Sequence, residues 1–278
     1  MRPAGHEMMP EEREAFDVAA ALPCLAGAGW RAVLRGGLER LLGLDATRRN
    51  FRSAAALPDG EDFAKALQAF GVGLDAPCFA AALPKEGPVV VMANHPFGGA
   101  DALALGALCR GWRPDSRVFA NALATALPGI GRHLIPLAIL GEEDAARTNA
   151  MGLRQAVGHL RGGGLIAVFP SGEVARRRNG VVAEGPWLPQ VVALALKLGA
   201  QIVVVRFSGG CPVWWHFVGA IHPMLRTALL PRVLLAMRGA SVKCRALRID
   251  PATLVGLDAE AAAVELRARM LALGVDGL

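Results

Sequence analysis

Hydrophobic and polar positions follow two different patterns along this chain of 278 residues. From about residue 16 to residue 70 the apolar positions recur every three to four residues, a spacing that is typical of amphipathic helices. Between residues 30 and 42 the apolar face consists of Trp30, Val33, Leu34, Leu38, Leu41 and Leu42. A helix of this kind with arginines off that face either lies in a membrane interface or packs on its own domain, and the glycines Gly36 and Gly37 weaken it in isolation.

After about residue 71 short apolar runs alternate with helical patterns. The predicted strands are residues 89–93, 117–120, 165–169, 201–207 and 242–249, and the predicted helices are 100–112, 142–160, 187–198 and 259–273. Such alternation indicates βαβ units. We therefore predict an α/β fold with a mainly parallel central sheet flanked by helices. Residues 1–70 form a helical N-terminal segment that is available for membrane docking, and residues 71–278 form the main domain.

Composition constrains where such a protein works. The chain is 53% hydrophobic, yet it has no run of about 20 apolar residues that would suit a membrane-spanning helix. The polar, acidic N-terminus has no apolar core typical of a signal peptide, and the five scattered cysteines lack a C-x-x-C pair. We expect a cytoplasmic protein that binds peripherally to the inner face of the plasma membrane.

The formal net charge of +6 indicates an anionic partner. Anionic lipid head groups, an acidic carrier protein and nucleic acid all satisfy this condition. Aromatic residues make up only 5% of the chain and tyrosine is absent, so the stacking surfaces of nucleic-acid-binding proteins are scarce. We therefore expect a lipid surface or an acidic carrier and no nucleic acid.

Two unusual stretches directly follow predicted strands, where parallel sheets gather their ligands. They read NHPFGGAD (residues 94–101) and FPSGE (169–173). In the first, His95 can accept a proton near neutral pH, and Asp101 can reach its far ring nitrogen if the glycines Gly98 and Gly99 fold the chain back. The same glycines could present N–H groups to a developing oxyanion. The alternative is that Asp101 caps the next helix and His95 is a hydrogen-bonded turn residue.

The string NHPFGGAD resembles the first motif of the glycerolipid and lysophospholipid acyltransferases, and in full it is similar to their hemolysin-like branch, which includes ornithine-lipid and other amino-lipid acyltransferases. FPSGE resembles the acceptor-site motif of the same family. The resemblance implies a glycerol-phosphate acyltransferase-like fold. It also implies transfer of a fatty acyl group from acyl-ACP or acyl-CoA to a lyso-lipid hydroxyl, with His95 as general base, Asp101 orienting it, and no cofactor.

The acceptor site departs from the pattern F-P-E-G-T-R that is usual in the glycerol-phosphate enzymes. Ser171 and Val174 occupy the positions of its Glu and Arg, which disfavours lysophosphatidic acid and favours a lyso-amino lipid such as lyso-ornithine lipid. Glu173 either contacts an amine-bearing head group or braces its loop. The expected substrate-binding residues are Asn94, Phe97, Gly98, Gly99, Phe169, Pro170, Ser171, Gly172, Glu173, Arg176, Arg177 and Arg178.

The remaining features leave several alternatives open. The three consecutive arginines form a solvated face or hold an anionic group. The aromatic segment 211–217 is core, a tunnel wall or a membrane-dipping loop. Arg132 lies near the family's second motif with a poor match, and the other histidines lack ligand spacing, so we expect no metal. The rival functions are a lysophosphatidic acid acyltransferase of phospholipid synthesis, a thioesterase and a non-catalytic lipid-binding protein.

Overall fold

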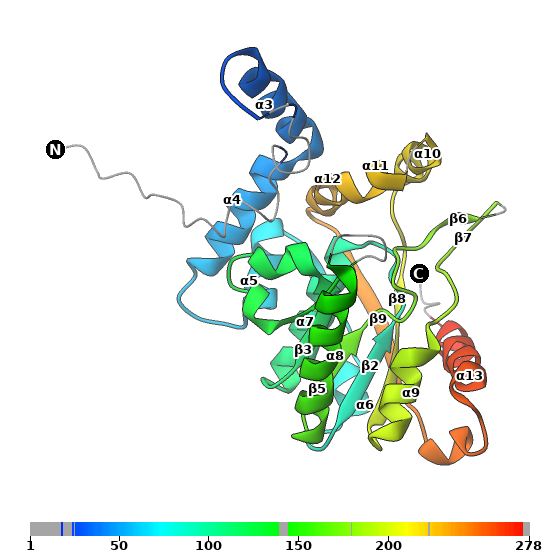
Figure 1. Cartoon of the computed structure of the whole chain (residues 1–278). Coiled ribbons are helices and arrows are strands. Elements are labelled where there is room, and N and C mark those ends of the chain that lie inside the picture. The colour runs from blue at the N-terminus through cyan, green and yellow to red at the C-terminus, as the bar shows by residue number, and fades with distance from the viewer. Residues whose placement is uncertain are drawn as a thin grey trace.

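A seven-stranded sheet forms the centre of the molecule (Figure 1). The computed structural model describes residues 26–138, 144–178, 180–221 and 223–274, together with Val18 and Cys24. In the order β1-β9-β8-β2-β5-β3-β4, the five strands from β8 to β4 run parallel, and β9 pairs antiparallel with β8. The strands are β1 (Gly73–Asp75), β2 (Val89–Ala93), β3 (Arg117–Asn121), β4 (Leu134–Leu137), β5 (Leu165–Val168), β8 (Gln201–Ser208) and β9 (Ser241–Arg248). The predicted α/β fold with a mainly parallel sheet is confirmed.

The described helices are α3 (Trp30–Leu42), α4 (Leu44–Ala55), α5 (Asp62–Phe70), α6 (Phe79–Ala82), α7 (Gly99–Trp112), α8 (Ala145–Arg161), α9 (Pro189–Lys197), α10 (Val213–Ile221), α11 (Pro223–Ala228), α12 (Leu230–Ala236) and α13 (Ala259–Ala272). Short 3₁₀ turns lie at Ala122–Ala126 (η2), Gly131–His133 (η3) and Pro251–Leu254 (η4). A separate hairpin joins β6 (Arg176–Arg178) to β7 (Val181–Ala183). The elements predicted after residue 71 lie where the sequence pattern placed them, except that the acidic residues 142 and 143, expected to open α8, fall outside the described residues.

Strand β2 shows why its sequence is apolar at every position. All five of its residues are buried, because helices cover both faces of the sheet. Val89, Val91 and Ala93 point into a core shared with α5 and α7. Val90 and Met92 point into a second core shared with α8, α9 and α13. The strand is therefore held rigidly from both sides, and so is the turn that follows it.

The helices before residue 71 do not behave alike. Phe51 of α4 and both Phe63 and Phe70 of α5 belong to the same core as the sheet. Helix α3, in contrast, has no buried residue, and its Trp30 and Val33 are 66% and 75% exposed. The start of this amphipathic helix therefore does not pack on the domain, whereas Glu39 near its other end pairs with Arg48 of α4 over 3.4 Å. Membrane docking of α3 stays a prediction. The division at residue 70 stays a prediction.

Helices α10 to α12 lie between β8 and β9 along the chain and approach the turn after β2. A Cβ atom placed on Gly98 would lie 2.6 Å from Cδ2 of Leu230 in α12, so the two segments are in close contact. In the aromatic segment, Trp215 is buried with Cys211 and Val233, whereas Phe217 is 63% exposed. Within the described residues, none of the helices combines the length and the apolar character that crossing a bilayer requires.

Candidate active site

The two unusual loops start at neighbouring strand ends and meet. Strands β2 and β5 pair in parallel, so the loops after Ala93 and Val168 leave the sheet at the same edge. The imidazole ring of His95 stacks on the ring of Phe169 with 3.8 Å between centroids and 22° between planes. In addition, the main-chain N–H of Ala175 donates to the carbonyl oxygen of His95 over 2.8 Å. The tertiary structure thus joins both motifs in one site.

Asp101 lies inside the first turn of α7 and is fully buried. Its Oδ2 accepts a hydrogen bond from the main-chain N–H of Phe97 (2.8 Å), and its Oδ1 accepts from that of Ala102 (2.9 Å). The Nδ1 atom of His95 lies 3.2 Å from Oδ2, which is ion-pair distance although the angle is not that of an aligned hydrogen bond. Asp101 therefore stabilises the turn and contacts the imidazole at the same time.

Gly98 makes this return of the chain possible. Its φ of 80° is in the left-handed region that side chains disfavour. It is also closely surrounded, because a Cβ atom there would lie 2.6 Å from Leu230 and 3.1 Å from Cγ2 of Val174. Glycine is the residue that satisfies both conditions, so this turn brings Asp101 back to His95.

Several of the expected substrate-binding residues are occupied by contacts within the protein. The Asn94 side chain donates to the carbonyl oxygen of Phe207 (2.9 Å) and accepts from its N–H (2.6 Å), which extends the pairing of β2 with β8. The ring of Phe97 is buried, and a Cβ atom on Gly209 would lie 2.6 Å from its Cζ. Asn94 and Phe97 therefore attach the loop to the end of β8 and the residues that follow it.

The loop after β5 is tied to its surroundings mainly through the main chain. The carbonyl oxygen of Pro170 accepts from the N–H of Leu188 (2.9 Å), and that of Phe169 accepts from the N–H of Gly172 (3.0 Å). Gly172 is exposed and Gly99 is half-buried. Ser171 donates its hydroxyl to the carbonyl oxygen of Glu173 (3.0 Å). Pro170, Ser171 and Gly172 thus belong to a loop that leaves the sheet at the same edge as the loop that carries His95.

Glu173 forms ion pairs with two of the three consecutive arginines. One of its carboxylate oxygens lies 3.2 Å from Nε of Arg176, and the other contacts Arg178. Arg177, between them in β6, is exposed. Of the two roles left open for Glu173, bracing of the loop is the one with contacts in this structure, and contact with an amine head group stays a prediction.

Sequence analysis did not identify Glu184, which lies just after β7 and is buried against His95. Its Oε2 accepts from the main-chain N–H of His95 (3.2 Å), and its Oε1 accepts from Nε1 of Trp187 (2.7 Å). Burial raises the pKa of Glu184, opposed by the hydrogen bonds from Trp187 and His95. In the sequence, Glu184 is the one acidic residue in the otherwise apolar stretch VVAEGPW (residues 181–187), and this could have marked it as a buried carboxylate.

Cys211 is another titratable group close to the pair formed by His95 and Asp101. Its Sγ lies 3.6 Å from the carbonyl oxygen of Phe97. Burial, together with the negative charge of Asp101, raises the pKa of the Cys211 thiol to about 12. At neutral pH this side chain is therefore a protonated thiol, which is a poor nucleophile.

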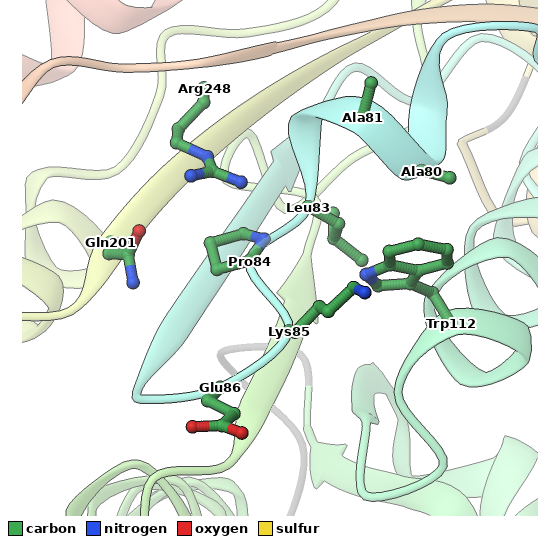
Figure 2. A pocket seen from close by; sticks show the side chains of 9 residues that line it. All are labelled: Ala80, Ala81, Leu83, Pro84, Lys85, Glu86, Trp112, Gln201 and Arg248. Atoms are coloured by element: carbon green, nitrogen blue, oxygen red, sulfur yellow. The ribbon is translucent and has the colours of Figure 1, made fainter.

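A wide depression of about 520 Å³ lies at the other end of the sheet (Figure 2). Glu86 precedes β2 and Gln201 begins β8, so this hollow is at the amino ends of the parallel strands, away from His95. In it, Nζ of Lys85 lies 5.7 Å from the ring centroid of Trp112. The hollow shares no residue with either motif.

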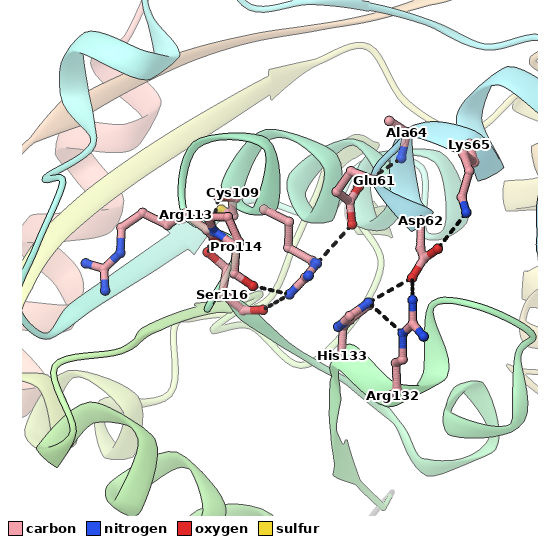
Figure 3. Close-up of polar contacts among 11 residues, drawn as sticks. Glu61, Asp62, Ala64, Lys65, Cys109, Arg113, Pro114, Ser116, Arg132 and His133 are labelled. Carbon is pink, nitrogen blue, oxygen red and sulfur yellow. Dashed lines mark hydrogen bonds and ion pairs between the residues drawn. The ribbon is translucent and has the colours of Figure 1, made fainter. Parts of the chain in front are cut away.

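Arg132 belongs to a polar cluster outside the active site (Figure 3). Asp62, at the start of α5, receives contacts from Lys65 (2.9 Å), Arg132 (2.5 Å) and His133 (2.9 Å). The neighbouring Glu61 caps α5 through the N–H of Ala64. The cluster therefore joins α5 to the segment before β4.

Comparison with known proteins identifies the family of this chain. A family model described as "Acyltransferase" matches residues 21–237. A lyso-glycine lipid O-acyltransferase of Bacteroides thetaiotaomicron is 29% identical over 130 residues, which is 46% of this chain and 45% of that protein. Another, from Phocaeicola vulgatus, is 27% identical over 128 residues, or 46% of this chain and 44% of that protein. The matches thus span less than half the length of these relatives.

One solved structure resembles the whole chain at low sequence identity. It is the 1-acyl-sn-glycerophosphate (LPA) acyltransferase PlsC from Thermotoga maritima, with 15% identity and a TM-score of 0.46. The match covers 94% of this chain and 93% of that one.

Proposed function

The chain belongs to the acyltransferase family, and from this premise we propose that it transfers a fatty acyl group from a thioester donor to a hydroxyl group of a lyso-lipid. The observation that supports the proposal best is the contact of His95 with buried Asp101, beside the loop that carries FPSGE. An imidazole held in this way is suited to general-base catalysis, which contributes roughly 10²–10⁴-fold to rate.

The proposed reaction is a direct transfer. Because Nδ1 of His95 faces Asp101, Nε2 is the nitrogen that accepts the proton from the acceptor hydroxyl. The hydroxyl oxygen forms a bond to the thioester carbonyl carbon, the carbon–sulfur bond breaks, and the imidazolium returns the proton to the departing thiolate. The donor is acyl-ACP or acyl-CoA. The steps need no further cofactor and no nucleophilic cysteine.

For the acceptor we favour a lyso-amino lipid, a class that includes lyso-ornithine lipid and lyso-glycine lipid. The relatives from Bacteroides and Phocaeicola are named for the second of these. Ser171 and Val174 supply no charged pair for a phosphate at the motif itself. Burial, together with the charge of Arg176, lowers the pKa of Arg226, which indicates a third guanidinium near the two that Glu173 holds. Such an excess of positive charge suits the carboxylate of an amino-acid head group.

We also propose that the protein docks on the cytoplasmic face of a membrane through α3 and α10. Both helices lie at one end of the molecule, together with α11 and α12 (Figure 1). Gly43, which follows α3, lies against α12, since a Cβ atom on it would be 2.7 Å from Leu235. Helix α12 in turn contacts the Gly98 turn next to His95. The exposed apolar side chains are Trp30, Val33, Leu34 and Leu41 on α3 and Val213, Trp214 and Phe217 on α10. An acyl chain could then enter the site from the bilayer.

The test incubates purified protein with labelled acyl-ACP, and separately with acyl-CoA, across lyso-glycine lipid, lyso-ornithine lipid, lysophosphatidic acid and other lysophospholipids. Mass spectrometry identifies the products, and His95→Ala is the control. A diacylated product that depends on His95 supports the proposal and identifies the acceptor. Free fatty acid without an acylated acceptor would indicate a thioesterase. Tight lipid binding without turnover would indicate a lipid-binding protein.

A further inference from the structure

The main chain of His95 is held from both sides by segments that follow β5. Its carbonyl oxygen accepts from Ala175 (2.8 Å), and its N–H donates to Oε2 of Glu184 (3.2 Å). Asp101 and Phe169 contact the ring. Three of these four groups, all except Asp101, lie between residues 169 and 184, so the position of the imidazole depends on the hairpin β6–β7 and its flanks.

Glu184 is suited to this task because both of its oxygens are acceptors. Oε1 receives the indole N–H of Trp187 (2.7 Å) while Oε2 receives the N–H of His95. Oε2 also lies 3.4 Å from the hydroxyl of Ser171, in the FPSGE loop. An amide or a protonated carboxyl group offers one good acceptor and one donor, and therefore cannot receive both N–H groups.

The charge of this buried carboxylate is balanced from a third element. Nε of Arg267 in α13 lies 3.9 Å from Oε1, and Nη2 of Arg267 donates to the main-chain oxygen of Glu184 (3.4 Å). His95 and Arg267 act on the pKa of Glu184 through their charge, and the ion pair of Glu173 with Arg178 lies beside the next residue, Gly185. Charge-assisted hydrogen bonds of this kind are stronger than neutral ones.

We infer that Glu184 is a positioning residue, whose ionised carboxylate fixes the main chain of His95 against the FPSGE loop so that the imidazole stays between Asp101 and the acceptor. This inference rests on the proposed acyl transfer. It assigns Glu184 no contact with substrate. Loss of the carboxylate is expected to misplace the imidazole, and a small misplacement of a catalytic group can cost about 10²-fold in rate.

The test compares Glu184→Gln with the wild type, with the best acceptor found above. At pH 8 we expect kcat to fall about 10–100-fold with KM changed by less than about threefold, because the substrate contacts remain. We also expect the difference in kcat between the variant and the wild type to narrow as the pH is lowered toward the pKa of Glu184, which burial raises. The protonated carboxyl group then offers one good acceptor, as the amide does. A Glu184→Gln variant that keeps more than a third of the wild-type kcat at pH 8 would overturn the inference.

Arg269→Gln is the matched control, because it removes an arginine of the same helix that pairs with Glu265 and Thr253 and not with Glu184. We expect its kcat to stay within about threefold of the wild type at pH 8. A loss as large as that of Glu184→Gln would show that disturbing α13 is enough to lower kcat, and would overturn the inference.

If Glu184→Gln does not fold, the double variant Glu184→Gln/Trp187→Phe replaces it. With the indole N–H gone, the amide oxygen is free for His95, so kcat should match that of Trp187→Phe within about threefold. A remaining loss of tenfold or more would contradict the inference.

One measurement is independent of turnover. The His95 main-chain amide, followed by hydrogen exchange, should lose protection in Glu184→Gln by about tenfold or more and keep it in Arg269→Gln. If the wild-type protein transfers no acyl group, the proposed function fails while this readout still decides whether Glu184 holds His95. If the His95 amide of Glu184→Gln were as protected as in the wild type, the positioning role would be wrong even in an active enzyme.

Discussion

At the scale of single residues, Asp101 contacts both the turn before α7 and the imidazole of His95. From the sequence it could be a helix cap or the partner of His95. In the structure its two oxygens hold the main chain at Phe97 and Ala102, and one of them also contacts the imidazole. The N-cap of α7 is Gly98, so Asp101 is not the cap. Its hydrogen bonds to the turn instead place its carboxylate against the imidazole.

Replacing Asp101 with Asn should therefore separate chemistry from folding. The amide keeps the shape and one acceptor but loses the charge that stabilises an imidazolium. We expect kcat to fall about 10²–10⁴-fold with little change in KM. Steady-state kinetics would measure this, and a thermal melt would show that the variant is folded.

Asp115→Asn is the control for that experiment. Asp115 pairs with Arg113 (2.6 Å) and contacts neither motif, so its replacement should leave kcat unchanged. If Asp101→Asn kept more than a third of the wild-type kcat, the orienting role of Asp101 would be wrong.

At the scale of secondary-structure elements, the cluster around Asp62 fastens α5 to the turn η3 (Figure 3). Helix α5 contributes Phe63 and Phe70 to the main core. Burial alone would raise the pKa of Asp62, but hydrogen bonds from Lys65, His133 and Arg132 outweigh it and hold the pKa well below its usual range. A carboxyl group with a lowered folded pKa stabilises the fold above its unfolded pKa.

Asp62→Asn should lower the free energy of unfolding by about 1–3 kcal/mol at pH 7, because three donors lose a charged acceptor. The contribution of Asp62 to the free energy of unfolding is complete above the pKa of about 3.9 that it has in the unfolded chain. It is lost as the pH falls through the lower pKa of the folded state. The difference in stability between Asp62→Asn and the wild type should therefore shrink below about pH 4. Chemical denaturation at several pH values would measure it.

The exposed neighbour Asp59 gives the control, since Asp59→Asn should stay within about 0.5 kcal/mol of wild type. An Asp62→Asn variant as stable as Asp59→Asn at pH 7 would show that the cluster does not stabilise the fold.

At the scale of the whole molecule, helices α3 and α10 each expose several large apolar side chains. These helices lie at the end of the molecule where α12 contacts the Gly98 turn. The positive net charge of +6 adds attraction to anionic lipids. Membrane docking in this orientation would present the active site to the bilayer.

The double variant Val33→Glu/Leu34→Glu should weaken binding to phosphatidylglycerol vesicles by about tenfold or more, since burying each such side chain contributes roughly 1.5–3 kcal/mol. Co-sedimentation would measure it, and the melting temperature should not change because both side chains are exposed. Val255→Glu, at an 82% exposed valine outside α3 and α10, is the matched control and should bind normally. Equal losses in both variants would contradict docking through α3.

Most strands and helices of the main domain, and the family, were predictable from the sequence alone. Strands such as 89–93 were predictable because burial on both faces makes every position apolar, and helices because their apolar positions recur locally. NHPFGGAD indicated the family, since a turn built on Gly98 is a local property of the chain. The family match confirmed that resemblance.

Which residues far apart in the sequence contact each other depends on the tertiary structure. Glu184 reaches His95 across 89 residues of sequence, and no local spacing reports such a contact. The antiparallel pairing of β9 and the exposure of α3 likewise depend on what the rest of the chain covers. A periodic pattern shows that a helix has an apolar face, but whether protein covers that face is settled by packing between segments far apart in sequence.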